Sequence, residues 1–181
     1  MITGRQVVLR GLERDDLKLM HKWLNDEEVM EWARSQPDNI SSMESIEKEF
    51  EQDLKGENPH RRTLIIVEKK TGKSVGWALI RSWRLYSTTR DIGLVIAEKR
   101  FRGKGLGTEA TRLLVDLAFD QQNMHKVELF TRPDNKAALK AVANCGFKLE
   151  GRLRETVYFN GKYHDGLVFG LLRSEYRRRK T

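Results

Sequence analysis

The chain has a single cysteine, Cys145, only three prolines in 181 residues, and no long apolar run. One cysteine excludes an internal disulfide framework and is typical of a protein from a reducing compartment. No stretch reaches the roughly 20 apolar residues that a membrane-spanning helix needs. The first residues, MITGRQVVLRG, lack the apolar segment of a secretory signal peptide. We therefore expect a cytoplasmic protein that has no membrane partner.

Motifs for several kinds of site are also missing. No string fits the GxxxxGK[ST] loop of nucleotide-binding proteins, and Gly103, Gly105 and Gly107 are spaced GxGxG rather than the GxGxxG of dinucleotide-binding folds. The histidines and the cysteine do not have the spacing of a metal site, so we predict no bound metal. The basic residues have no aromatic platform among them, which disfavours nucleic-acid binding as the main function.

The charge that is present is divided unevenly along the chain. Residues 1–90 hold 16 Lys and Arg against 15 Asp and Glu, whereas residues 91–181 hold 18 against 11. Within the first part, residues 27–57 hold ten acids and three bases. The basic C-terminal half suits a polyphosphate ligand and the acidic stretch suits a cationic one, although acidic residues also simply solvate helix faces.

Hydrophobic periodicity and turn residues predict one α/β domain. We expect strands over residues 6–10, 63–68, 75–83, 91–96, 126–131, 147–159 and 163–171. We expect helices over residues 13–24, 27–32, 43–54, 107–121 and 135–144, a loop over 35–42 and a frayed tail over 177–180. Asn160-Gly161 predicts a tight hairpin turn, Gly146 a helix C-cap, and Ser41 or Ser42 a helix N-cap.

The stretch RFRGKGLGTEA, residues 100–110, joins the strand predicted over 91–96 to the start of a helix. Its glycines remove the side chains that would hold a ligand away from the main chain. A helix start offers unpaired N–H groups and the positive end of the helix dipole. Arg100, Arg102 and Lys104 add positive charge. The loop therefore predicts a phosphate site, although a glycine-rich turn that only starts a helix fits the same residues.

The order of motifs around this loop resembles the GNAT superfamily of N-acetyltransferases. The similarity lies in IAEKRFRGKGLGTEATRLLVDLAF, NMHKVEL, the spacing from Asn135 to Cys145-Gly146-Phe147, and EGRLRE with FNGKYHDG. It is greatest to the branch with ribosomal-protein N-terminal and spermidine acetyltransferases, and is strong over residues 91–170. The resemblance implies a mostly antiparallel mixed sheet flanked by helices, with a V-shaped splay between the cofactor strand and the strand after it. It divides the chain into an acceptor-side part (1–60), an acetyl-CoA core (61–171) and a basic tail (172–181).

The resemblance also implies acetyl-CoA as the cosubstrate. Its pyrophosphate is expected on main-chain N–H groups of the loop, and its pantetheine arm beside the strand that precedes the loop. Asn135 matches an asparagine that reaches the cofactor arm, and it is equally suited to cap the next helix. The expected cofactor-binding residues are Leu94, Val95, Ile96, Arg102, Gly103, Lys104, Gly105, Leu106, Gly107, Thr108 and Asn135.

The family's proton-transfer groups are missing at the matching positions. A tyrosine is usual five residues before the phenylalanine of CGF, where this chain has Val142. The serine and glutamate of the ribosomal branch are replaced by Ala138 and Val157. We therefore assign the general acid to water and expect the base among two remaining carboxylates, Asp91 and Glu155. Both carboxylates also fit ordinary surface positions.

Two aromatic residues are predicted to bind the acceptor. Trp32 precedes the segment that forms the acceptor lid in the family, and Tyr163 follows the predicted hairpin turn. Packing of the lid helix and of the hairpin would also explain them. Trp23, Trp77 and Cys145 are predicted to lie in the core.

The predicted function is acetyl transfer from acetyl-CoA to a primary amine by direct attack. A protein or peptide N-terminus is the favoured acceptor, and a homodimer is a candidate assembly. A polyamine or diamine is the alternative acceptor, favoured by the acidic stretch and disfavoured by the basic overall charge. A module that binds coenzyme A without turnover is a further alternative, because the usual proton-transfer groups are missing.

Overall fold

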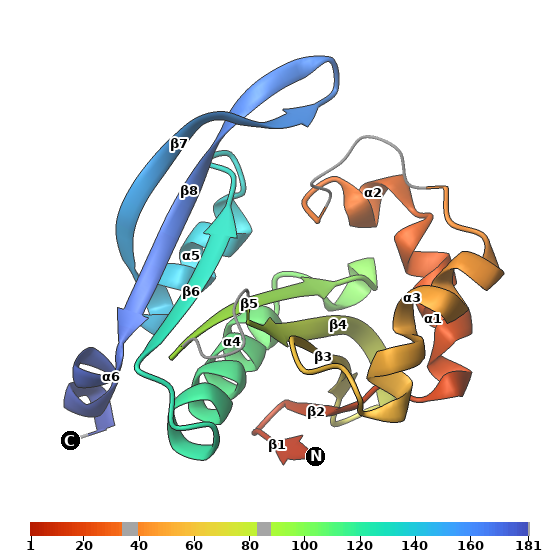
Figure 1. The fold of residues 1–181 in the computed structure, drawn as a ribbon, viewed down its shortest axis with the longest axis horizontal. Helices are drawn as coiled ribbons and strands as arrows, with labels where there is room; N and C mark the ends of the chain where they lie inside the picture. Colours follow the sequence, from red (N-terminus) through yellow and green to blue (C-terminus); the bar gives the residue numbers. More distant parts are fainter. Residues whose placement is uncertain (34–39, 83–87, 181) are drawn as a thin grey trace.

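An eight-stranded sheet runs through the centre of the computed structural model, which describes residues 1–33, 40–82 and 88–180 (Figure 1). The strand order is β1-β2-β3-β4-β5-β6-β8-β7, and neighbouring strands are antiparallel except for β5 and β6, which are parallel. The strands are β1 (Ile2–Thr3), β2 (Val7–Gly11), β3 (Arg61–Glu68), β4 (Lys73–Arg81), β5 (Thr89–Ile96), β6 (Lys126–Thr131), β7 (Lys148–Phe159) and β8 (Lys162–Leu172). The predicted α/β class and mostly antiparallel mixed sheet are confirmed.

Helices cover both faces of this sheet. They are α1 (Leu17–Leu24), α2 (Glu27–Met30), α3 (Met43–Lys55), α4 (Leu106–Asp116), α5 (Lys136–Cys145) and α6 (Arg173–Lys180). Short turns of other helix types are η1 (Arg14–Asp16), η2 (Lys99–Phe101) and η3 (Leu117–Gln121). Figure 1 shows α1, α2 and α3 together on one side of the sheet and α4 on the other. Among the described residues, no helix is both long enough and apolar enough to cross a bilayer.

The apolar residues form two core clusters, one on each face of the sheet. One cluster contains residues of α4 and α5, and the other contains residues of α1, α2 and α3. Ile65 and Ile66 are adjacent in β3 and both fully buried, but they belong to different clusters, because successive side chains of a strand point to opposite faces. Trp23 of α1 stacks on Trp77 of β4 with ring centroids 6.0 Å apart. Both tryptophans are buried, as predicted.

The local signals of turns and caps are also confirmed. Asn160 and Gly161 have φ values of 48° and 73°, which is the left-handed backbone that a two-residue hairpin turn requires. Gly146 ends α5 with φ 79°, and the Ser42 side chain accepts a hydrogen bond from the Ser45 N–H at the start of α3. Cys145 is buried at the end of α5.

Several boundaries differ from the predicted ones. The two-residue strand β1 was not expected, since so short a segment shows no periodicity. The helix predicted over 107–121 is α-helical only to Asp116 and then widens into the π-helical turn η3. The tail predicted to fray over 177–180 instead continues α6. Most of the loop predicted over 35–42, and Trp83 at the end of the predicted strand 75–83, lie outside the described residues.

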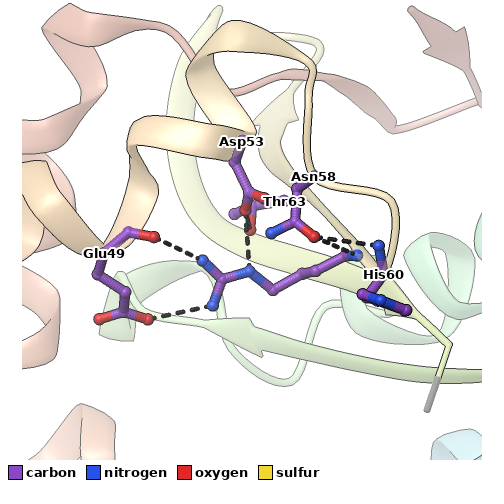
Figure 2. A network of polar contacts seen from close by, with 6 residues as sticks. Glu49, Asp53, Asn58, His60 and Thr63 are labelled. Atoms are coloured by element: carbon purple, nitrogen blue, oxygen red, sulfur yellow. Dashed lines mark hydrogen bonds and ion pairs between the residues drawn. The ribbon is translucent and has the colours of Figure 1, made fainter. Parts of the chain in front are cut away.

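A polar network attaches the second half of α3 to the first residues of β3 (Figure 2). Asp53 has a side chain that is 1% exposed, and its Oδ2 accepts hydrogen bonds from Arg61 Nε at 3.0 Å and Thr63 Oγ1 at 2.5 Å. Glu49, one turn earlier on α3, pairs with the same guanidinium at 3.2 Å. Arg61 is the cross-strand partner of Arg81 in β4, so the network fixes the acceptor-side helices beside the strand that carries Arg81.

We expect Asp53→Ala to lower the free energy of unfolding by about 2–3 kcal/mol, because it leaves the Arg61 Nε and the buried Thr63 hydroxyl without their acceptor. Urea unfolding followed by circular dichroism measures this change. The matched control is Glu51→Ala on the same helix, whose exposed carboxylate pairs with Lys55 one turn along the helix, and which should leave the unfolding midpoint unchanged. Equal effects of the two substitutions would show that the network does not anchor α3.

Candidate functional site

The splay predicted between the cofactor strand and the next strand is present. β5 and β6 pair in parallel from Thr89 opposite Lys126 to Asp91 opposite Glu128, and beyond this point the two strands have no further paired residues. Figure 1 shows them diverging. Leu94, Val95 and Ile96 lie in the diverging half of β5, which keeps β4 as its neighbour on the other side. The edge of β5 that faces β6 is therefore open to an extended ligand there.

The glycine loop follows directly at the open end of β5. Gly103 and Gly105 have φ values of 74° and 84°, and Gly105 is the residue that precedes α4. Among the described residues, a Cβ added at Gly103 would meet nothing within 4 Å, and one at Gly105 would meet only Gln6 Nε2 at 3.9 Å. No hydrogen bond joins the N–H groups of residues 103–108 to another main-chain atom of the described chain. The loop thus presents a run of free donors beneath open space at a helix start, which fits a pyrophosphate.

The side chains of the loop have separate tasks. Arg102 donates from Nε to the Ile96 carbonyl at 3.0 Å and from Nη2 to the Ala97 carbonyl at 2.9 Å, and its main-chain N–H donates to the Lys99 carbonyl at 3.1 Å. Arg102 therefore shapes the loop by tying it to the end of β5. Lys104 extends over the Phe101 ring, with Nζ 5.6 Å from the ring centroid.

Asn135 caps the helix that begins beyond the splay. Its Oδ1 accepts a hydrogen bond from the Ala138 N–H at 3.0 Å, so the capping role weighed from the sequence is present. The amide nitrogen of the side chain has no hydrogen-bond partner within the described chain and can donate to a ligand in the splay.

A cleft of about 340 Å³ lies where β5 and β6 begin to separate. Its lining residues come from four strands: Arg81, Asp91, Glu128, Leu129, Phe130 and Val168. Asp91 and Val95 share one face of β5, the face that packs toward α1 and α3, because alternate side chains of a strand point the same way. The cleft therefore opens on the acceptor side, away from α4.

Asp91 is the titratable group at the centre of this cleft. Its side chain is 10% exposed, and Oδ1 lies 2.5 Å from Arg81 Nε. Burial raises the pKa of Asp91 above its ordinary value, the Arg81 charge opposes that rise, and the nearby Glu128 carboxylate adds to it. Glu128 itself pairs with Lys126 at 2.7 Å. A buried carboxyl with a raised pKa beside a cleft has the properties of a proton acceptor.

Glu155 lies elsewhere, in an irregular part of the β7–β8 hairpin. The pairing register shifts between Leu153 and Val157, and Glu155 is exposed with φ 51°. Its N–H donates to Asp165 Oδ1 at 2.9 Å. Glu155 is not among the residues that line the cleft, so the structure does not bring the two predicted catalytic carboxylates together.

The two predicted acceptor-binding aromatics have different partners. Trp32 is 43% exposed, and the Arg132 guanidinium lies 4.5 Å from its ring centroid. Tyr163 is exposed on the hairpin, with its ring 5.1 Å from that of Tyr158. The positions that lack the family's proton donors carry no hidden substitute, because Val142 and Val157 are both buried apolar residues.

Sequence reasoning missed Arg81, Glu128, Phe130 and Arg132. Arg81 had a usable signal, since β4 and β5 form consecutive antiparallel strands and Arg81 is directly opposite Asp91. Glu128 and Arg132 had none, because their partners are 37 and 100 residues away. Within the described residues, no group of three or more His, Cys, Asp or Glu is arranged to hold a metal ion.

Comparison with known proteins places this geometry among acetyltransferases. Residues 6–148 match the sequence family described as "Acetyltransferase (GNAT) domain". The spermidine N(1)-acetyltransferase of Vibrio cholerae is 28% identical over 174 residues, which cover 96% of this chain and 97% of that protein. An aminoglycoside N(6')-acetyltransferase of Klebsiella pneumoniae is 25% identical over 155 residues, 82% of this chain and 77% of that protein. A crystal structure of the Vibrio cholerae spermidine N-acetyltransferase with CoA and spermine shares the fold, with a TM-score of 0.84 at 24% identity over 95% of this chain and 98% of that chain.

Proposed function

The chain belongs to the GNAT family of acetyltransferases, and from this premise we propose that its acceptor is a small polycationic amine, with a polyamine such as spermidine favoured. Membership of the family makes the chain an acetyl-CoA-dependent N-acetyltransferase. Family membership does not determine the identity of the acceptor, which depends on the residues on the face of the sheet opposite α4.

The observation that carries the choice of acceptor is the pair of carboxylates in the cleft. Asp91 and Glu128 line it together with one guanidinium, that of Arg81. Lys126 pairs with Glu128 and also with Glu150, so three carboxylates face two cations around the cleft, and a site with more acid than base favours a cationic ligand. A protein N-terminus was the favoured acceptor from the sequence alone, but the relatives that match over nearly the whole chain include spermidine acetyltransferases and support the polyamine alternative.

Acetyl-CoA supplies a thioester whose carbonyl carbon is open to attack by an amine. We propose that residues 103–108 hold its pyrophosphate through their main-chain N–H groups, with the α4 dipole adding to the attraction. The open edge of β5 at Leu94, Val95 and Ile96 is proposed to pair with the pantetheine arm, and Asn135 to reach it from the other side of the splay. Main-chain N–H groups near Val95 and Ile96 are the proposed donors to the oxygen that becomes negative during attack.

Asp91 is proposed as the proton acceptor for the incoming amine. Val95 lies four positions further along the same face of β5, which corresponds to about 13 Å along a strand. One water cannot bridge this distance, so the proton is proposed to reach Asp91 along a chain of several waters in the cleft. The same distance allows the carboxylates of Asp91 and Glu128 to attract a second ammonium group of the acceptor. Val142 and Val157 cannot donate a proton, so the departing thiolate is expected to take one from water.

An acceptor panel tests the proposal. The protein is incubated with acetyl-CoA and, in separate reactions, spermidine, spermine, an aminoglycoside, free amino acids and peptides with ribosomal-protein N-termini, and thiol release and product mass are measured. We expect the highest kcat/KM for spermidine or spermine. A higher value for a peptide would overturn the polyamine proposal. Binding of coenzyme A without thiol release for any amine would favour the non-catalytic alternative.

A further inference from the structure

Arg132 is a buried arginine at the end of β6, where that strand has already separated from β5. It is 7% exposed. Its guanidinium carbon lies 4.5 Å from the ring centroid of Trp32 and 4.6 Å from that of Phe159. One cation therefore contacts two aromatic rings that come from the segment after α2 and from the tip of the β7–β8 hairpin.

The N–H groups at the edges of the same guanidinium also donate hydrogen bonds. Nε and Nη2 donate to the two carboxylate oxygens of Asp134 at 3.0 and 2.9 Å, and Nη1 donates to the Glu31 carbonyl at 3.2 Å. The hydrogen bonds from Arg132, and then its charge, lower the pKa of Asp134, so this carboxylate stays ionised and the pair is neutral overall. The planar fork of arginine is needed for this set of contacts, because an ammonium group cannot stack and make a bidentate pair at once.

The segment from α2 to Trp32 is held at both sides of the splay. On the side of β5, Glu28 accepts from Arg102 Nη1 at 2.7 Å and from Lys99 Nζ at 3.1 Å. On the side of β6, Glu31 and Trp32 contact Arg132. Figure 1 shows α2 over the opening between the diverging ends of β5 and β6. The segment thus connects the loop after β5 with the end of β6, at the side where the two strands have separated.

We propose that Arg132 is a positioning residue for acceptor selectivity: by holding Trp32 and Phe159 together, it fixes the wall that admits slender amines and excludes bulky ones. The proposal rests on the proposed function. It assigns Arg132 to neither the chemistry nor the acetyl-CoA site, since within the described residues the polar and ring contacts of the guanidinium are with the acceptor-side segment, the hairpin tip and its own loop.

The location of Arg132, Trp32 and Phe159 favours a role in selectivity over one in folding. Neither Trp32 nor Phe159 belongs to the two core clusters, and Trp32 remains 43% exposed. A buried ion pair contributes little net stability compared with apolar residues of the same size. The contacts of Arg132 instead join three segments: the residues after α2, the tip of the β7–β8 hairpin and the loop after β6.

The test compares the wild-type protein with Arg132→Ala, using spermidine and a bulky aminoglycoside as acceptors in separate reactions. We expect the KM for spermidine to rise about tenfold or more, and the ratio of kcat/KM for spermidine over a bulky aminoglycoside to fall about tenfold or more, because two cation–π contacts and one bidentate pair are lost. The KM for acetyl-CoA should stay within about twofold. Arg132→Lys, which keeps the charge without the planar fork, should not restore selectivity.

Two further variants keep the test decisive. Trp32→Leu alters an exposed side chain, so it should fold and reproduce the loss of selectivity even where Arg132→Ala does not fold. Arg152→Ala removes an exposed arginine of the same hairpin that pairs with Asp165, and it should leave the ratio unchanged. An unchanged ratio in Arg132→Ala and Trp32→Leu, or a parallel rise in the KM for acetyl-CoA, would overturn the proposal. If the wild-type protein does not acetylate spermidine, the proposed function is wrong. The selectivity ratio is then measured between the best acceptor found in the panel and a bulkier amine of the same chemical class.

Discussion

Gly105→Val is expected to weaken the binding of acetyl-CoA about 100-fold or more, which corresponds to roughly 2.7 kcal/mol. Gly105 has φ 84°, a backbone region that a β-branched residue rarely adopts. Relief of that strain would rotate the N–H groups that precede α4. The new side chain would also stand in the open space over the helix start, where Gln6 Nε2 is the one atom of the described residues within 4 Å of the added Cβ. Isothermal titration calorimetry with coenzyme A measures the loss.

A control substitution at a second glycine distinguishes the effect of backbone strain from the loss of the cofactor site. Gly72 lies in the turn between β3 and β4 with φ 67° and open space at its Cβ position. Gly72→Val should therefore destabilise the fold by about 1–2 kcal/mol, much as Gly105→Val does, but bind coenzyme A with unchanged affinity. Equal loss of affinity in the two variants, or normal affinity in Gly105→Val, would show that the loop does not bind the cofactor.

Asp91→Asn is expected to lower kcat/KM for the best acceptor about 100-fold or more, since a positioned general base contributes roughly 10²–10⁴-fold. Burial raises the pKa of Asp91, so in wild type the carboxyl is protonated, and inactive as a base, up to a higher pH than an ordinary aspartate. The kcat/KM profile should therefore have an acidic limb that falls as pH decreases through this raised pKa. In Asp91→Asn the limb should disappear. Initial rates of thiol release across the acidic and neutral range measure both effects.

Asp165→Asn is the matched control for this substitution. Asp165 is also an aspartate paired with an arginine, but it lies on the β7–β8 hairpin and not in the cleft. It should leave kcat/KM and the acidic limb in place. If Asp91→Asn kept the wild-type limb and rate, Asp91 would be a structural partner of Arg81, and the base would have to be sought elsewhere.

The parts of the fold that depend on local chemistry were predictable from the sequence. Gly146 and Asn160-Gly161 occupy left-handed backbone positions that few other residues tolerate, so their identities predict the turns they make. The glycine loop before α4 was predictable for the same reason, together with the helical spacing that follows it. The splay between β5 and β6 was an expectation from resemblance, because nothing in either strand's own residues shows where pairing stops.

The acceptor side was less accessible to sequence reasoning. Glu155 was a candidate base on the strand predicted over residues 147–159, but the pairing register shifts between Leu153 and Val157, and Glu155 is not among the residues that line the cleft. Glu128 reaches Asp91, and Arg132 reaches Trp32 and Phe159, only after strands distant in sequence pair. Such contacts are properties of tertiary structure, and no spacing within one segment indicates them.

The central claim is that free main-chain N–H groups between β5 and α4 hold the pyrophosphate of the acetyl carrier. Calorimetric titration of the wild-type protein with coenzyme A and, separately, with pantetheine, which has the same thiol arm without the pyrophosphate and nucleotide, tests it most directly. The account predicts that coenzyme A binds about 100-fold or more tightly than pantetheine, and that this advantage shrinks as salt concentration rises. Equal affinities for the two compounds would contradict it.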